Sequence, residues 1–157
     1  MSPISKGLAN FAVAAVLSTA AAAQGLVTQK NIPLAMAQTI ANAALAKCES
    51  MGFKVSVVVV DRDGLPIVML RGDGSGLHTP EGADRKAYTA RTFSQPSAAF
   101  TKRTQDDPNS VLATIYPRAG AGRRTADVVG AVGVSGSPGK DDVCSQAGID
   151  KVADLLN

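Results

Sequence analysis

The sequence predicts one compact α/β (α+β) domain that follows a short N-terminal export segment. Segments with helical spacing of apolar residues alternate with short β-branched runs, and two of those runs flank the turn-forming pair Asp63-Gly64. The chain has 157 residues, a length that suits a single domain with a hydrophobic core of its own. These observations favour a mixed fold in which helices cover a sheet.

Residues 1–23 have the composition of a secretory signal peptide. One lysine precedes an apolar run over residues 11–23, which ends in an A-x-A cleavage pattern. The run is shorter than the roughly 20 residues of a permanent transmembrane helix. We therefore expect cleavage after Ala23 and a periplasmic or secreted domain of residues 24–157. This domain keeps 15 basic and 13 acidic residues, a net charge of +2 that gives no indication of nucleic-acid binding.

The first expected elements of the domain are a helix and a hairpin. Residues 33–51 predict an amphipathic helix, because apolar residues recur at spacings of three and four. These residues are Ala37, Ile40, Ala44, Cys48 and Met51. Residues 54–61 and 65–72 are apolar runs on either side of Asp63-Gly64, which predicts a β-hairpin.

A second helix is expected after the glycine-rich stretch that follows the hairpin. Thr79 would cap its N-terminus, Pro80 would fit its first position, and Glu81 would favour the positive end of its dipole. A stripe of small side chains then follows at Ala83, Ala87 and Ala90. Such a stripe lets a helix lie close against a sheet or against a flat ligand.

The C-terminal part predicts a strand and a last helix. Residues 126–136 indicate a buried strand, whose glycines mark the close approach of another backbone or of a ligand. Residues 142–156 have helical spacing at Val143, Ala147, Val152 and Leu155. The polar composition and the prolines of residues 94–111 predict mostly loop. The secondary structure of residues 115–125 is ambiguous.

Cys48 and Cys144 are the two cysteines of the chain. A disulfide is permitted in an oxidising compartment, and closing so long a loop stabilises a fold. Two separate cysteines that pack as small hydrophobic residues are an equally good interpretation. The sequence leaves both open.

Two familiar nucleotide-binding motifs fail in this sequence. The segment GVSGSPGKDD approaches a P-loop, but Val134 replaces its first glycine and Asp141 replaces the Ser or Thr that would hold magnesium. Gly72, Gly74 and Gly76 have the wrong spacing for a dinucleotide fingerprint and follow a hairpin strand. Nucleotide binding is therefore not expected.

His78 is the only histidine, and it lies between the glycine-rich stretch and the second helix. A loop histidine with no role is the commoner situation for this residue type. Its surroundings nevertheless favour a ligand site, because glycines allow close approach, the helix has an alanine face, and several cations are near in sequence. These cations are Arg71, Arg85, Lys86 and Arg91. A flat, apolar, dianionic ligand with an iron centre would use all of these features.

Three segments resemble the GlcG/HbpS family of haem-binding proteins, which is related to the C-terminal domain of PduO-type proteins. They are VSVVVVDRDGLPIVMLRGDG, HTPEGADRKAYTARTF and VVGAVGVSGSPGKDDVCSQAGI, in this order. The resemblance covers nearly all of the mature chain. Residues 117–127 depart from it, since PRAGAGRRTAD replaces the family's common glycine-rich stretch and Asp-Gly hairpin.

The resemblance implies a compact domain with an antiparallel sheet and helices packed on it, higher oligomers, and haem or a related tetrapyrrole as ligand. For some members it implies a proposed part in haem degradation or redox sensing. The first hypothesis is an exported haem-binding protein that stores, senses or traffics haem, with His78 as axial iron ligand. Arg71, Arg85 or Lys86 would pair with propionates, while Ala83, Ala87 and Phe93 would pack on the macrocycle.

Alternatives stay open at this stage. Arg85 fits equally well on a solvated helix face, because Glu81 precedes it by four residues. Met69 and Tyr88 are other conceivable iron ligands. A different class of function is an oligomeric module that binds small carboxylates without iron, through Arg71, Lys86 and the amides before Thr79. Haem degradation, a third possibility, requires an open iron position and an electron source.

Overall fold

The fold is known from a computed structural model that describes residues 25–96, 99, 102 and 128–156. Its elements are α1 (Leu34–Ser50), β1 (Ser56–Val60), β2 (Pro66–Arg71), α2 (Thr79–Phe93), β3 (Ala131–Ser135), α5 (Asp141–Asp150) and the 3-10 turn η1 (Ala153–Leu155). The predicted signal segment and residues 117–127 lie outside the described residues. No helix within the described ranges is long and apolar enough to cross a membrane.

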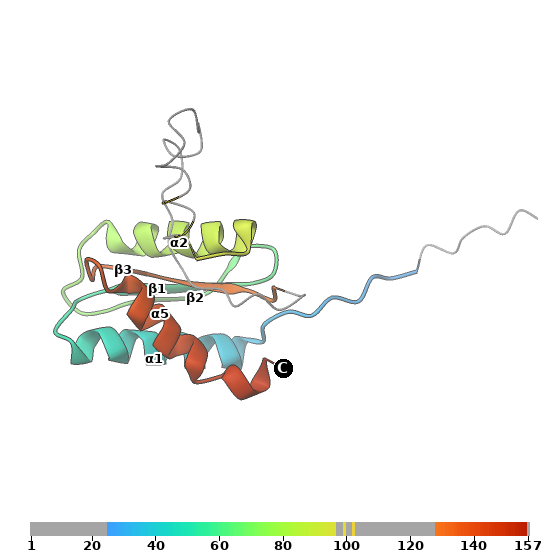
Figure 1. Cartoon of the computed structure of the whole chain (residues 1–157), viewed down its shortest axis with the longest axis horizontal. Coiled ribbons are helices and arrows are strands. Elements are labelled where there is room, and N and C mark those ends of the chain that lie inside the picture. The colour runs from blue at the N-terminus through green and yellow to red at the C-terminus, as the bar shows by residue number, and fades with distance from the viewer. Residues whose placement is uncertain (1–24, 97–98, 100–101, 103–127, 157) are drawn as a thin grey trace, which may run out of the picture.

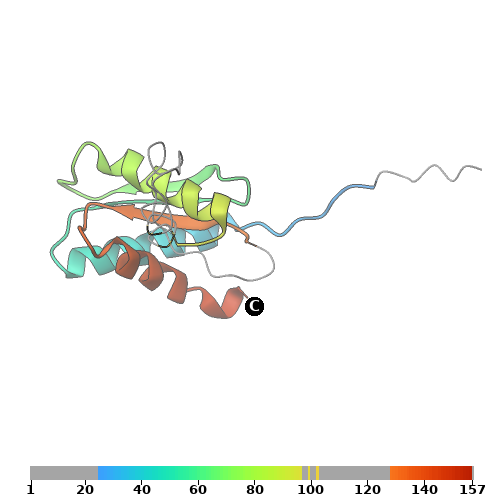
Figure 2. The same ribbon diagram turned by 45° about the horizontal axis from the view of Figure 1, so that its top comes forward.

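The described elements form three layers (Figure 1). Helix α2 covers one face of the sheet, and α1 and α5 cover the other face, an arrangement that the turned view in Figure 2 also shows. In the described part of the sheet the strand order is β2-β1-β3, and β1 is antiparallel to both neighbours. The predicted α/β class, with helices on an antiparallel sheet, is confirmed.

The central strand β1 is buried along its whole length, because helices cover both of its faces. Val57 and Val59 belong to the core cluster shared with α1 and α5, whereas Val58 and Val60 pack with alanines of α2. Side chains of directly paired residues point to the same face of an antiparallel sheet. Met69 of β2 pairs with Val58, so Met69 lies on the α2 face.

The predicted first helix and hairpin are both present. The inward face of α1 carries buried Ala37, Ile40, Ala44 and Cys48, as the spacing indicated. At the hairpin, Gly64 has a φ of +83°, a conformation that glycine adopts without steric cost. The carboxylate of Asp61 accepts the amide protons of Asp63 at 2.8 Å and Leu65 at 2.9 Å, which fixes the turn.

The start of α2 differs from the prediction. Thr79 is the first helical residue, and His78 holds the N-cap position without a side-chain cap bond. The hydroxyl of Thr79 instead donates to the carbonyl of Gly76 at 2.8 Å and lies 2.8 Å from the hydroxyl of Ser56. The prediction that Thr79 caps this helix is therefore wrong, because a strand residue distant in sequence engages its hydroxyl.

Helix α2 lies unusually close to β3. Ala83, Ala87 and Ala90 are fully buried against the sheet. A Cβ added at Gly133 of β3 would lie 2.1 Å from the carbonyl oxygen of Ala83. The glycine of the predicted strand therefore marks the approach of another backbone, one of the two options that the sequence left open.

The last helix is shorter and turned relative to the prediction. Helix α5 ends at Asp150, and its buried residues are Cys144, Ser145, Gly148 and Ile149. The predicted inward positions Val143 and Leu155 are 38% and 69% exposed. Val152, another of the predicted positions, is buried, so the prediction of that face is wrong only in part. Gly148 instead packs against α1, where a Cβ would meet the carbonyl oxygen of Ile40 at 2.6 Å.

Cys48 and Cys144 form a disulfide that links α1 to α5, with a Cα–Cα distance of 5.5 Å. Both cysteines are completely buried, and the bond lies in the core between the two helices. The structure thus decides between the two interpretations that the sequence left open.

Candidate functional site

The α2 face of the sheet is only partly covered. Helix α2 packs mostly on β3 and β1 and less on β2. Met69 of β2, which points to this face, is consequently 50% exposed. Arg71, two residues further along the same face, is also exposed. We call this uncovered part, together with the neighbouring His78 and Tyr88, the β2 strip.

His78 lies at the end of the β2 strip where the chain turns into α2. Its side chain is exposed, and the ring lies over Gly76, where an added Cβ would meet Cε1 at 3.0 Å and Nδ1 at 3.2 Å. A guanidinium nitrogen of Arg71 donates to the carbonyl of Ser75 at 3.0 Å. Arg71 thereby holds the loop that carries His78, and both side chains belong to the same end of the molecule.

Tyr88 lies at the other end of the β2 strip. Its ring covers the hairpin turn, since a Cβ added at Gly64 would lie 3.1 Å from Cδ2 of Tyr88. The side chain remains 46% exposed. Together with Met69, it gives the strip an apolar surface that also carries a thioether and a phenol.

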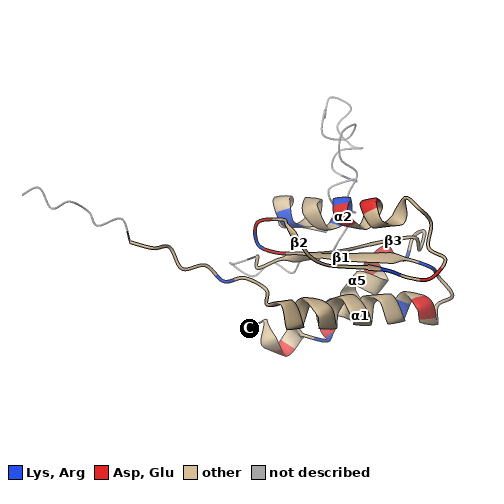
Figure 3. Ribbon diagram, turned by 180° about the vertical axis from the view of Figure 1, so that it is seen from behind, with Lys and Arg blue, Asp and Glu red and all other residues tan. Residues whose placement is uncertain are grey.

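The two neighbouring cations of α2 have different surroundings. Arg85 pairs with Glu81 one turn earlier, with side-chain exposures of 43% and 64%, as a solvated helix face predicts. Lys86 is only 20% exposed and pairs with Asp141 of α5, which is 17% exposed. Lys86 therefore faces inward, and its ammonium is engaged by a carboxylate of the same chain. Figure 3 shows charged residues along α2.

The remaining predicted site residues do not meet His78 at one place. Ala83 and Ala87 are fully buried against the sheet, so the sheet occupies the position that the sequence analysis gave to a macrocycle. Phe93 ends the 15-residue helix at whose start His78 lies. At a rise of about 1.5 Å per residue, these two residues are separated by about 22 Å along the helix axis.

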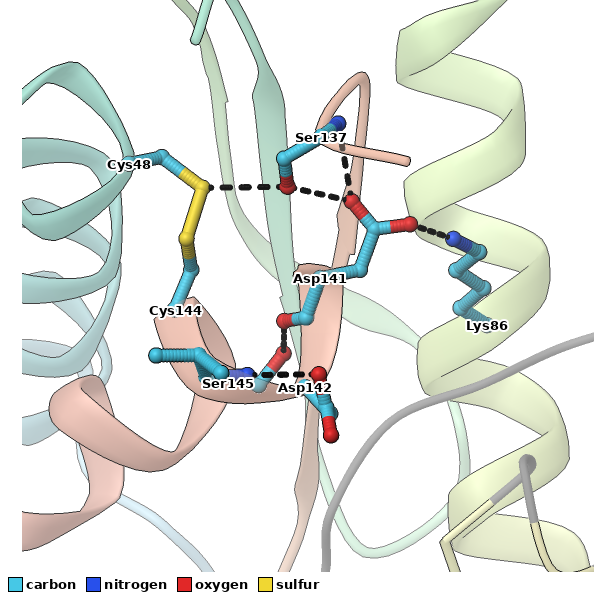
Figure 4. A network of polar contacts seen from close by, with 8 residues as sticks. Cys48, Lys86, Ser137, Asp141, Asp142, Cys144 and Ser145 are labelled. Carbon is cyan, nitrogen blue, oxygen red and sulfur yellow. Dashed lines mark hydrogen bonds and ion pairs between the residues drawn. A yellow bond between two sulfur atoms is a disulfide. The ribbon is translucent and has the colours of Figure 1, made fainter. Parts of the chain in front are cut away.

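Sequence reasoning missed a polar network that starts at Lys86 (Figure 4). Asp141 accepts hydrogen bonds from the amide of Ser137 at 3.0 Å and from its hydroxyl at 2.6 Å. The Ser137 hydroxyl lies 3.2 Å from Sγ of Cys48. A local Ser-x-x-x-Asp pattern contains part of this network, but Lys86 is 55 residues away from Asp141, so no local signal could reveal the pair.

No other feature of the described residues is a better candidate site than the β2 strip. Among these residues, no group of three or more His, Cys, Asp and Glu side chains could hold a metal ion. A shallow hollow of about 560 Å³ lies beside α5 and is lined by Lys47, Val143, Gln146 and Ala147, among others. None of the predicted site residues lines this hollow.

Comparison with known proteins decides the family. The family model described as haem degrading protein, HbpS-like, matches residues 32–150. This chain belongs to the HbpS-like family. No curated protein matches the chain. The HbpS-like assignment confirms the resemblance seen in the sequence motifs, and the family's description connects the chain with haem.

Solved structures agree with the HbpS-like assignment. A crystal structure of HbpS has 35% identity and a TM-score of 0.74, and the match covers 82% of this chain and 96% of that one. A double mutant of HbpS from Streptomyces reticuli has 30% identity and a TM-score of 0.73, with 99% of each chain covered. A PduOC–haem complex has 21% identity and a TM-score of 0.69, covers 77% of this chain and 94% of that one, and shows the shared fold.

The β2 strip of this HbpS-like chain carries side chains of the types that ligate haem iron. An imidazole, a thioether and a phenol, the three side-chain types of His78, Met69 and Tyr88, are all known axial ligands of haem iron. All three side chains are exposed. Arg71 adds a cation for a carboxylate at the His78 end.

Proposed function

We propose that this protein binds haem on the β2 strip, with His78 as an axial iron ligand. The observation that carries the proposal is an exposed histidine beside an uncovered, apolar part of the sheet, in a chain of the HbpS-like family. Bound haem supplies an iron centre whose ligands set its reactivity. The protein's own part is to ligate the iron and to hold the macrocycle against the strip.

Each residue has a stated role in this proposal. His78 would ligate the iron, and Met69 and Tyr88 would contact the macrocycle in place of the buried Ala83 and Ala87. Arg71 pairs with a propionate. Lys86 pairs with Asp141 on the side of α2 away from Tyr88, and it has no role on the β2 strip.

A haemin titration tests the assignment. The mature chain from Gln24 is titrated and followed by absorbance, beside His78→Ala and the matched control Leu77→Ala, which alters the neighbouring exposed side chain. We expect a saturable Soret band for the parent and the control, and a shifted or lost band for His78→Ala. An unchanged spectrum in His78→Ala would overturn the ligand assignment.

A parent chain without a saturable band would overturn haem binding itself. Thermal stabilisation by small carboxylic acids would then favour a carboxylate-binding module that uses Arg71. The family's description as haem degrading supports a second candidate, the breakdown of bound haem. Loss of the Soret band in air on addition of ascorbate, with release of iron to a chelator, would support degradation, whereas a stable band would support storage, sensing or transport.

We also propose that the protein is exported and forms homo-oligomers. The disulfide supports export, because structural disulfides persist mainly in oxidising compartments. Exposed Leu34 and Leu65 support self-association. An N-terminus at Gln24 in the extracytoplasmic fraction tests export, and light scattering after size exclusion tests assembly.

A further inference from the structure

The disulfide and the ammonium of Lys86 are joined by a continuous series of polar contacts (Figure 4). Ser137 contacts Sγ of Cys48 and donates its hydroxyl proton to one carboxylate oxygen of Asp141. The other oxygen of Asp141 accepts from Lys86. One carboxylate therefore connects the α1–α5 side of the sheet to α2.

The disulfide also fixes the turn that carries this carboxylate. Asp141 opens α5, and Cys144 follows it by three residues, so the bond to Cys48 ties the first turn of α5 to α1. The N-cap residue Lys140 makes no side-chain cap bond. A helix of ten residues is unstable in isolation, so tertiary contacts must hold its first turn.

The segment before this turn adds little support. Pro138, Gly139 and Lys140 are exposed, and Gly139 has a φ of +69°. The contacts that hold the turn include the disulfide and a hydrogen bond of 2.8 Å from the Ser145 hydroxyl to the carbonyl of Asp141. Two backbone hydrogen bonds add to them, from the amide of Lys140 to the carbonyl of Ser137 and from the amide of Cys144 to the carbonyl of Lys140. The disulfide is the covalent contact that ties this turn to α1. Its opening therefore gives Asp141 more conformational freedom before it disturbs the sheet.

We propose that the Cys48–Cys144 disulfide controls the availability of Lys86. While the bond is closed, Asp141 holds the ammonium. Because both sulfurs are buried, a dithiol reductant reaches the bond only during transient opening of the α1–α5 contact. It then opens the bond by two successive exchanges, in which the reductant becomes a cyclic disulfide and Cys48 and Cys144 each become a protonated thiol. The first turn of α5 then opens more often, and Lys86 becomes available to a carboxylate of a ligand. The control of Lys86 does not depend on the proposed haem site.

The test measures the reactivity of Lys86 without any ligand. Oxidised protein and protein reduced with dithiothreitol, whose intact mass shows the gain of two hydrogens, are labelled briefly with an acetylating reagent. Peptide mass spectrometry then compares Lys86 with exposed Lys30 as internal reference. We expect reduction to raise the relative labelling rate of Lys86 about tenfold, which corresponds to about 1.4 kcal/mol of lost local stability.

Two kinds of variant distinguish the effect of the disulfide on Lys86 labelling from the effect of the Asp141 carboxylate. The double variant Cys48→Ala with Cys144→Ala should label rapidly without reductant and should not respond to it. Asp141→Asn should raise the labelling of Lys86 in both redox states, whereas the matched control Asp142→Asn, in the same turn and exposed, should leave it slow.

Three outcomes would overturn the proposal. The first is equal Lys86 labelling before and after reduction, and the second is slow labelling in Asp141→Asn. The third is complete loss of amide-exchange protection in β1 on reduction, beyond the decrease that follows from lower global stability, because the disulfide would then hold the whole fold rather than one turn. A failed haemin titration leaves this test unaffected.

Discussion

At the scale of single residues, close backbone contacts decide the position of α2. Small side chains on the helix and Gly133 on β3 let the two backbones approach to a distance that no larger residue permits. The alanine stripe could be predicted from the sequence, but its contact with the sheet rather than with a ligand could not. Periodicity shows that one face of a helix is small and does not show what packs against it.

Gly133→Ala should therefore be strongly destabilising. The added Cβ would meet the carbonyl oxygen of Ala83 at 2.1 Å and the amide nitrogen of Ala87 at 2.5 Å, so α2 would have to move. We expect the free energy of unfolding in urea to fall by about 1–3 kcal/mol, as for other overpacked sites. Gly25→Ala, with no atom within 4 Å of the new Cβ, is the control. Equal stability of the two variants would contradict the close packing.

At the scale of elements, the two ion pairs of α2 differ in burial and hence in their contribution to stability. The Arg85–Glu81 pair is within one helix and largely solvated, whereas the Lys86–Asp141 pair connects two helices on opposite faces of the sheet and is mostly buried. The first follows from a spacing of four residues and could be predicted. The second depends on how α5 turns its first residue toward α2.

Removal of each pair should show this difference in urea unfolding. Arg85→Ala should change the free energy of unfolding by about 0.5 kcal/mol or less, because solvent screens the exposed pair. Asp141→Asn should lower it by about 1–3 kcal/mol, since Lys86 and Ser137 both lose a charged hydrogen-bond partner. Asp142→Asn controls for the change in net charge. A loss in Arg85→Ala as large as that in Asp141→Asn would contradict this ranking.

At the scale of the whole molecule, the disulfide joins the first and last helices of the described fold across a sequence separation of 96 residues. Both helices cover the same face of the sheet (Figure 1). A cross-link over so long a loop restricts the unfolded chain strongly. The β2 strip lies on the opposite face, where neither of these helices covers it.

Reduction should lower the global stability without abolishing the fold. We expect the free energy of unfolding to fall by about 2–5 kcal/mol, less than the total of a typical domain, about 5–15 kcal/mol. Urea unfolding of oxidised and reduced protein measures the change, and the m-value should rise because the reduced unfolded chain exposes more surface. Coincident unfolding curves would contradict this role of the disulfide.

Local patterns in the chain were sufficient to predict the first helix, the hairpin, the alanine face of α2 and the family, because periodicity, turn chemistry and motifs depend on residues close together in the chain. The sequence also singled out His78, whose role as a haem ligand stays a prediction. The pairing of Cys48 with Cys144 and of Lys86 with Asp141 is evident from the folded arrangement alone. These contacts join segments 96 and 55 residues apart, and their approach depends on how the helices pack on the sheet, which no local pattern encodes.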